Sequence, residues 1–161
     1  MAEASKLTSR VDPPNGIYPA RVDEKGRLKF PAKFQQYIQS FGDPRVFVTS
    51  LDTTTARIYP ISVWNENQEF FEQFTANPEA AEDVAFIAND LGADAELDTQ
   101  GRVLLPQELR QLLSIENQPV WLHCYKGRIL LYSKEVYEQR KAKAREGLAE
   151  KLRELEKGGL R

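Results

Sequence analysis

The chain has 161 residues and a formal net charge of −2, a size that fits one domain with two halves or two very small domains sharing a core. A single Cys excludes a disulfide framework within the chain and a multi-cysteine zinc site, and it suits a reducing cytoplasm. Residues 1–16 lack the hydrophobic centre of a signal peptide, and no apolar run reaches membrane length. We therefore expect a cytoplasmic chain that makes no membrane contact.

Charge is segregated along the chain. Residues 1–57 carry nine Lys and Arg against six acids, residues 58–101 carry none against ten, and residues 102–161 carry thirteen against eight. An acidic middle between two basic ends argues against a uniformly basic coat for nucleic acid, but it permits a local basic face.

Residues 17–23 alternate in polarity, with Tyr18, Ala20 and Val22 on one face. A turn follows at Asp23 and Gly26, because Asp bonds its own backbone and Gly allows positive φ. Beyond it, Leu28 and Phe30 share one face while Arg27 and Lys29 share the other. The stretch predicts a hairpin with one apolar face and one basic face, to which Arg21 and Lys25 add charge.

Helices are expected on both sides of the next strand, residues 45–50. Pro31 precedes Phe34, Tyr37, Ile38 and Phe41 at helical spacing, and Gly42 is a stop signal. Residues 60–75 carry aromatic side chains at roughly helical spacing, and residues 78–89 begin with Pro and acids. We expect the first of these two to pack on the barrel and both to expose an acidic side.

Residues 97–109 repeat the first turn in degenerate form. Asp98, Gly101 and Arg102 stand as Asp23, Gly26 and Arg27 do, and Pro106 matches Pro31. The resemblance continues in order from residues 45–50 to residues 119–124, and from Tyr59, Val63 and Trp64 to Tyr132, Val136 and Tyr137. An ordered series of matches indicates two copies of one unit. In the second copy we expect Ala93, Ala95 and Leu97 to point inward, and Leu109, Leu112 and Leu113 recur at helical spacing.

Residues 133–157 predict one charged helix with Ser133 as its N-cap. Leu148, Leu152 and Leu155 form a narrow stripe that could pair with another helix, although a solvated helix that frays past Gly147 is the simpler interpretation.

The inventory for catalysis is thin. His123 and Cys124 are the only residues of their types, and neighbours on a strand point to opposite faces, so they cannot act as a pair. Cys124 is expected to be a structural residue. No phosphate loop or dinucleotide fingerprint is present, and we expect no metal and no cofactor. A small hydrolase would require a cleft that pairs His123 with a carboxylate.

Two interpretations of Arg27 and Arg102 are open. Each could close a surface salt bridge to the Asp of its own turn, worth at most about 1 kcal/mol. A turn needs Gly but does not need Arg directly after it, and the planar guanidinium suits phosphate and guanine recognition. Repetition in both copies favours recognition.

The stretches GIYPARVDEKGRLKFPAKF and AELDTQGRVLLPQELR together resemble the MraZ family, bacterial regulators encoded at the head of the division and cell-wall gene cluster. The resemblance covers about residues 15–140 and leaves out the last twenty. It implies a mainly β, α+β fold in which two tandem AbrB-like hairpin units interleave into one β-barrel flanked by helices. It also implies a ring of copies that binds short direct repeats in the promoter of its own operon, mainly as a repressor on the nucleoid. DNA contact falls on Arg27 and Arg102.

Family members usually carry several basic residues before the second motif, whereas this chain has an acidic run there. We therefore expect the first turn to supply most of the affinity, with Arg21, Lys25 and Lys29 assisting Arg27 while Arg102 stands nearly alone.

The expected organisation has five segments: a flexible arm at 1–15, a first AbrB-like unit at 16–75, a connecting helix at 76–92, a second unit at 93–140 and a charged helical tail at 141–161. The predicted partners are double-stranded DNA and further copies of the chain, with no small-molecule substrate. The alternative is a non-enzymatic protein-interaction module, such as an antitoxin-like partner binder on the same fold.

Overall fold

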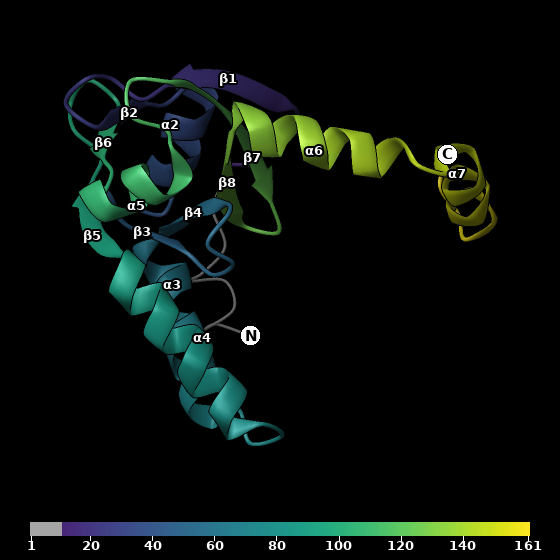
Figure 1. The fold of residues 1–161 in the computed structure, drawn as a ribbon, viewed down its shortest axis with the longest axis horizontal. Coiled ribbons are helices and arrows are strands. Elements are labelled where there is room, and N and C mark those ends of the chain that lie inside the picture. The colour runs from purple at the N-terminus through teal and green to yellow at the C-terminus, as the bar shows by residue number, and fades with distance from the viewer. Residues whose placement is uncertain (1–10) are drawn as a thin grey trace.

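A computed structural model describes residues 11–161, so the expected arm is described only from Val11 onward. The fold is α+β and mostly antiparallel (Figure 1). Its strands are β1 Ile17–Arg21, β2 Arg27–Lys29, β3 Arg45–Ser50, β4 Ala56–Pro60, β5 Ala93–Glu96, β6 Arg102–Leu104, β7 Pro119–Tyr125 and β8 Arg128–Ser133. Its helices are α2 Ala32–Gln39, α3 Ile61–Gln73, α4 Pro78–Leu91, α5 Gln107–Leu113, α6 Lys134–Arg145 and α7 Leu148–Lys157.

The strands exchange partners between the two sequence copies. One sheet has the order β1-β7-β8-β4-β3-β5, and β2 pairs with β6 in a separate ribbon. Strands β1 to β4 of the first copy correspond to β5 to β8 of the second. When each strand is exchanged for its counterpart, the same order is obtained starting from the opposite edge. The expected hairpins are therefore wrong, since β1 pairs with β7 and only a Val22–Leu28 bridge joins the two sides of the first turn. Exchange allows both copies to finish one sheet, whereas a lone two-stranded hairpin is marginal in water.

The pairing among residues 11–161 gives an open sheet and a ribbon, and no closed barrel is found. Strands β1 and β5 form the two edges of the sheet, at opposite ends of the strand order.

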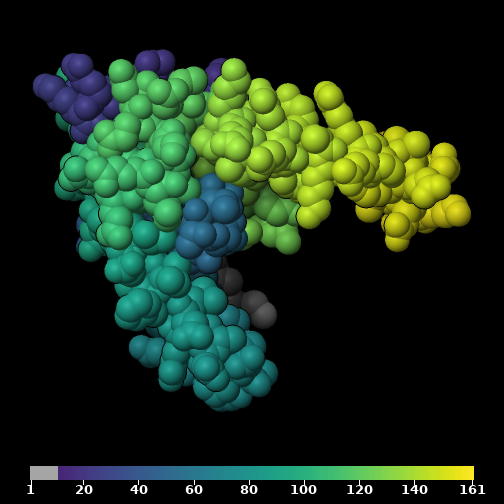
Figure 2. Space-filling view, in the orientation of Figure 1, coloured from purple at the N-terminus to yellow at the C-terminus, as the bar shows by residue number. Residues whose placement is uncertain are grey.

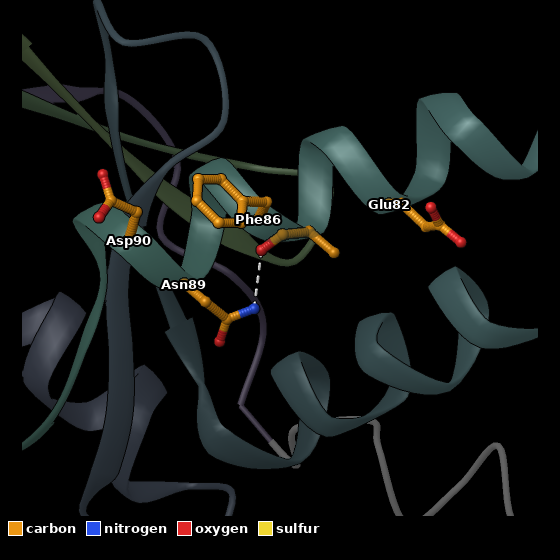
Figure 3. A pocket seen from close by; sticks show the side chains of 5 residues that line it. Glu82, Phe86, Asn89 and Asp90 are labelled. Atoms are coloured by element: carbon orange, nitrogen blue, oxygen red, sulfur yellow. Dashed lines mark hydrogen bonds between the residues drawn. The ribbon is translucent and has the colours of Figure 1, made fainter.

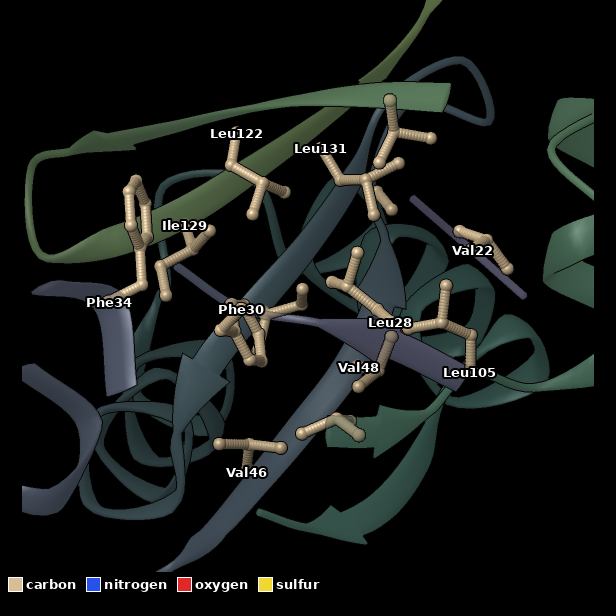
Figure 4. Packing of buried hydrophobic residues seen from close by; sticks show 14 of the residues in the cluster. Val22, Leu28, Phe30, Phe34, Val46, Val48, Leu105, Leu122, Ile129 and Leu131 are labelled. Atoms are coloured by element: carbon tan, nitrogen blue, oxygen red, sulfur yellow. The ribbon is translucent and has the colours of Figure 1, made fainter. Parts of the chain in front are cut away.

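One core lies between the sheet, the ribbon, α2 and α5 (Figure 4). Leu28 and Val103 are fully buried from the two strands of the ribbon, as Leu122, Ile129 and Leu131 are from β7 and β8. The alternation of residues 17–23 and 28–30 is confirmed, because the residues expected to face inward are buried or partly buried. In the second copy Ala95 and Leu97 turn inward as expected, but Ala93 and Leu112 are exposed.

A second, aromatic cluster anchors α3 and α4 to the sheet. Trp64 stacks on Phe47 with ring centroids 4.5 Å apart, and Ala88 completes the cluster from α4. The Thr49 hydroxyl donates to the carbonyl of Ala88 at 2.5 Å, which fixes α4 to β3. Helix α3 thus packs on β3 and β4 of the sheet, while farther along it Phe70 is 56% exposed.

The C-terminal segment is two helices instead of one. Ser133 caps α6 as expected by accepting a hydrogen bond from the Val136 amide at 3.3 Å. The helix ends at Arg145 because Glu146 is extended, and Gly147 then takes a left-handed φ of +61°. Figure 1 shows α6 and α7 on a different side of the molecule from α3 and α4.

The two turns are locked by the opposite copy. Main-chain hydrogen bonds of 3.0 Å run from Leu105 N to Gly26 O and from Phe30 N to Gly101 O. Both glycines have positive φ, +84° for Gly26 and +77° for Gly101. A Cβ on Gly26 would lie 2.3 Å from the guanidinium of Arg110, on α5 of the other copy.

We predict that Gly26→Ala destabilises the fold by about 1 kcal/mol more than Gly42→Ala, because the added Cβ displaces the Arg110 guanidinium from its bonds to Leu105 O and Glu116. Gly42 is a matched control, since its φ is +78° and nothing lies within 4 Å of the added Cβ. Both substitutions therefore carry the same cost of a left-handed φ. Urea unfolding measures the difference, and equal losses would show that Arg110 yields without cost.

Candidate nucleic-acid interface

The ribbon brings the basic residues of both copies onto one surface. In its register Arg27 lies opposite Leu104, Leu28 opposite Val103, and Lys29 opposite Arg102. Directly opposed residues of an antiparallel pair share a face. Because Leu28 and Val103 are buried, the outer face consists of Arg27, Lys29, Arg102 and Leu104, and we call these four residues the ribbon face.

The Asp of each turn holds its own turn together. Asp23 Oδ1 accepts from the amides of Lys25 at 3.0 Å and Arg27 at 2.8 Å, and Asp98 Oδ1 accepts from Gln100 and Arg102 at 2.8 and 2.9 Å. The turns also close through 3.0 Å main-chain bonds from Gly26 N to Asp23 O and from Gly101 N to Asp98 O.

Each Asp also fixes the Arg of its turn by one edge. The Nε of Arg27 donates to Asp23 Oδ2 at 2.9 Å, and Arg102 Nε makes the same bond to Asp98 Oδ2 at 2.9 Å. Both ion pairs are partly exposed, with about a third or less of the Arg side chain accessible. Within residues 11–161 the terminal guanidinium nitrogens of both Arg residues make no hydrogen bond. Each Arg could therefore keep its salt bridge and still bind DNA, because the terminal nitrogens of its guanidinium remain available.

The other basic residues differ in how they relate to the ribbon face. Lys29 donates its ammonium to the carbonyl of Gln100, which ties it to the second turn beside Arg102. Arg102 thus has a basic neighbour from the first copy, and its smaller share of the DNA affinity stays a prediction. Lys25 is exposed at the tip of the first turn. Arg21 lies on β1 and donates to the carbonyl of Asn117 at 2.9 Å, so the structure joins it to the loop before β7.

The two turn carboxylates are acidified. The pKa of Asp23 lies below its ordinary value chiefly because the amide of Arg27 donates to the carboxylate, and the Arg27 side chain adds to this effect. The pKa of Asp98 is lowered for the same reasons by Arg102. A second groove contains His123, whose pKa is lowered by burial and then by Arg140.

Cys124 faces the core and His123 the opposite side, as the strand alternation predicts. Burial raises the pKa of the Cys124 thiol to about 11, which leaves it protonated and unreactive at neutral pH. No carboxylate lines the groove around His123, so the partner that a hydrolase would need is missing from that groove. Within residues 11–161 no cluster of His, Cys, Asp and Glu could hold a metal ion. None of the helices there has the length and apolarity to cross a bilayer.

Sequence reasoning missed Gln35 and Arg110. Gln35 Nε2 donates to Phe30 O at 2.6 Å and Arg110 Nε to Leu105 O at 3.0 Å, and each side chain also covers the turn glycine of the other copy. The sequence repeat could have revealed them, because Gln35 and Arg110 both lie four residues after the Pro of their copy.

The chain is similar in sequence to known proteins over more than half of its length. A family model described as "MraZ protein, putative antitoxin-like" matches residues 92–157. The transcriptional regulator MraZ of Acidobacterium capsulatum is 39% identical over 105 residues, which cover 65% of this chain and 72% of the relative. The chain belongs to the MraZ family. The match through residue 157 corrects the expectation that the last twenty residues lie outside the resemblance.

Two further relatives bear the same name. The transcriptional regulator MraZ of Koribacter versatilis is 33% identical over 104 residues, covering 64% of this chain and 71% of the relative. The regulator of Anaeromyxobacter sp. (strain Fw109-5) is 31% identical over 127 residues, covering 76% and 85%. All three relatives are named as transcriptional regulators.

We predict that Asp23→Asn combined with Asp98→Asn flattens the acid-side loss of stability. A carboxyl whose folded-state pKa is depressed stabilises the fold above its unfolded value of 3.8, and that contribution disappears as pH falls through the folded pKa. The melting temperature, followed from about pH 5 to about pH 2, should therefore fall less in the double variant than in the wild type.

Part of the slope should remain, because Asp43 and Asp52 also have lowered pKa values. Glu24→Gln is the matched control, since it removes a carboxylate from the first turn that accepts no hydrogen bond within residues 11–161. A double variant with the slope of the wild type would contradict the assignment.

Proposed function

We propose that this chain is a DNA-binding transcriptional regulator, acts mainly as a repressor of its own operon and has no enzymatic activity. The observation that carries the proposal is the ribbon face, where two Arg residues are held by Asp partners with their outer nitrogens available. The names of the relatives support the regulatory role. Binding to the promoter would place the protein on the nucleoid.

The ribbon suits the approach to a duplex. A two-stranded β-ribbon fits the major groove of B-DNA, and Arg can bond guanine or phosphate through two donors. Along the ribbon Arg27 and Arg102 are two residues apart in register, which corresponds to roughly 7 Å. That spacing is close to the distance between neighbouring phosphates or two base steps, so one chain could contact only a short site.

One ribbon face is a weak binder on charge alone. The two turns and the ribbon contain Arg27, Arg102, Lys25 and Lys29 against three acids, Asp23, Glu24 and Asp98. Several copies would have to act together to reach useful affinity, because linked sites convert later contacts into intramolecular ones. A ring of copies on short direct repeats meets this requirement, and we propose that assembly for this chain.

The test is a mobility-shift titration with DNA from upstream of its own gene. Arg27→Ala should weaken binding by about 1 to 3 kcal/mol, roughly 5- to 150-fold, because it removes a guanidinium at the contact surface. From the charge of the first turn we also expect Arg27→Ala to weaken binding more than Arg102→Ala. Log affinity should fall steeply with log salt.

Arg45→Ala provides a matched control. Arg45 likewise donates its Nε to a local Asp, Asp43, at 3.1 Å, but it lies on β3 and not on the ribbon face, and its side chain is more exposed than that of Arg27. Equal losses from Arg27→Ala and Arg102→Ala would contradict the asymmetry. A wild type with no preference for promoter DNA over random duplex would contradict the operator.

A protein-interaction module is the second candidate. Leu148, Leu152 and Leu155 are 54%, 47% and 60% exposed on one side of α7, and the matched family model is described as antitoxin-like. Removal of residues 147–161 distinguishes the two, because it deletes the stripe and leaves the ribbon intact. Under the regulator proposal promoter binding survives the truncation, whereas its loss would favour the interaction module.

A further inference from the structure

A groove on the outer side of the sheet, bounded by α6, gathers positive charge over an apolar floor. Its lining includes Arg128, Arg140 and Lys141 with Tyr132, Tyr137 and Leu130, and it contains no acidic side chain. None of the three cations forms a salt bridge within residues 11–161. We call this feature the cationic groove.

One atom of the cationic groove is left without a partner. Arg128 Nε is buried and makes no hydrogen bond within the described part of the chain. A buried donor without an acceptor destabilises the protein until a partner satisfies it. Tyr137 in the groove is held by its neighbours. Its ring stacks on Trp121 with centroids 4.9 Å apart, and the ammonium of Lys141 lies 4.6 Å from its centroid. The groove is thus suited to a partner that is both acidic and aromatic.

Helix α4, which lies toward the other edge of the sheet, presents an aromatic side chain flanked by acidic ones. Phe86 is 70% exposed, the largest exposed fraction among the large hydrophobic residues of the described chain. Glu82 and Asp90 lie one helical turn before and after it, and Asn89 completes this face (Figure 3). We call Phe86 with Glu82 and Asp90 the acidic knob. Neither carboxylate forms a salt bridge within residues 11–161.

The knob cannot enter the groove of its own chain. Helix α4 is fixed to β3 by the bond from Thr49 to Ala88, toward the β5 edge, whereas the groove lies on β7 and β8 toward the β1 edge. Figure 2 shows the α3–α4 segment and the α6–α7 segment projecting on different sides of the molecule. The two features could meet only between copies.

We propose that the acidic knob of one copy docks in the cationic groove of the next. Phe86 would lie over Tyr132 and Tyr137, while Glu82 and Asp90 pair with Arg140, Lys141 and Arg128. The segregation of charge along the chain supports a second copy as the occupant, because the acidic middle and the basic C-terminal third are complementary. The inference rests on the proposal that the regulator acts as an assembly.

The geometry of such a contact differs from that of a symmetric dimer. Knob and groove are different surfaces, so the interface is heterologous and each copy has one of each left to offer. Repetition of the contact produces a ring if the rotation closes and a filament if it does not. Every copy in a ring would then present its own ribbon face.

Charge exchange tests the contact directly, by sedimentation velocity without DNA. The knob variant carries Glu82→Lys and Asp90→Lys, and the groove variant carries Arg140→Glu and Lys141→Glu. Each alone should be monomeric where the wild type assembles, because like charges then meet. Mixed together they should assemble again, since the wild-type pair and the reversed pair are both restored. High salt should weaken assembly of the wild type.

Phe86→Ala should weaken assembly by about tenfold or more, as truncation of a buried aromatic anchor does. Phe70→Ala is its control, an exposed aromatic on α3 outside the knob, and Lys143→Glu is the control on α6 outside the groove. A wild type that stays monomeric, variants that assemble like the wild type, or a mixture without rescue would each overturn the proposal.

The outcome is separable from that of the DNA proposal. Arg27→Ala should assemble normally, and the monomeric knob variant should still bind a single DNA repeat weakly. Normal assembly without promoter preference would defeat only the DNA proposal. Promoter binding by a protein that never assembles would defeat only the docking.

Discussion

The pairing of β2 with β6 joins the two sequence copies and brings their turns together at the candidate site. The two strands are only three residues long, yet Leu28 and Val103 carry them into the core and leave Arg27, Lys29 and Arg102 outside. Each turn is then clamped by the other copy, through main-chain bonds at Gly26 and Gly101 and the covering side chains of Arg110 and Gln35. Without this exchange, the two basic turns would belong to separate hairpins.

The turn chemistry explains why an Asp accompanies each Arg. A free Arg side chain loses up to about 2 kcal/mol of rotamer entropy when it is held at a contact. Asp23 and Asp98 already hold the Nε atoms of the two Arg side chains in the folded protein. Part of the rotamer entropy is therefore lost on folding, and less is lost on binding. The carboxylates also cancel much of the local positive charge, which favours short-range contact over long-range attraction.

Much of the local structure could be predicted from residue patterns. The strand at residues 45–50 agrees with β3 at both ends, α4 was expected within two residues of its observed end, and Ser133 caps its helix as proposed. Alternation placed Val22, Leu28 and Phe30 inward, because burial on one face imposes a period of two. The Asp, Gly and Arg spacing located both turns and the residues of the candidate site.

Partner choice could not be read from those patterns. Alternation states which side of a strand is buried but not which strand lies beside it, so β1 was assigned to β2 instead of β7. The same gap concealed the closeness of Lys29 to Arg102, since these residues meet only through the β2–β6 register. Gly147 was expected to mark where the C-terminal helix frays, whereas its left-handed conformation ends one helix, α6, and begins another, α7.

The exchange of strands between the two copies also affects how the chain folds during synthesis. Strand β1 is synthesised before its partner β7, which is complete only after Tyr125 has been added. Until then the nascent chain holds an unpaired strand edge, the kind of surface that pairs wrongly with other chains. Neither half can finish its sheet alone, so the fold can be completed only after strands of the second copy have been synthesised.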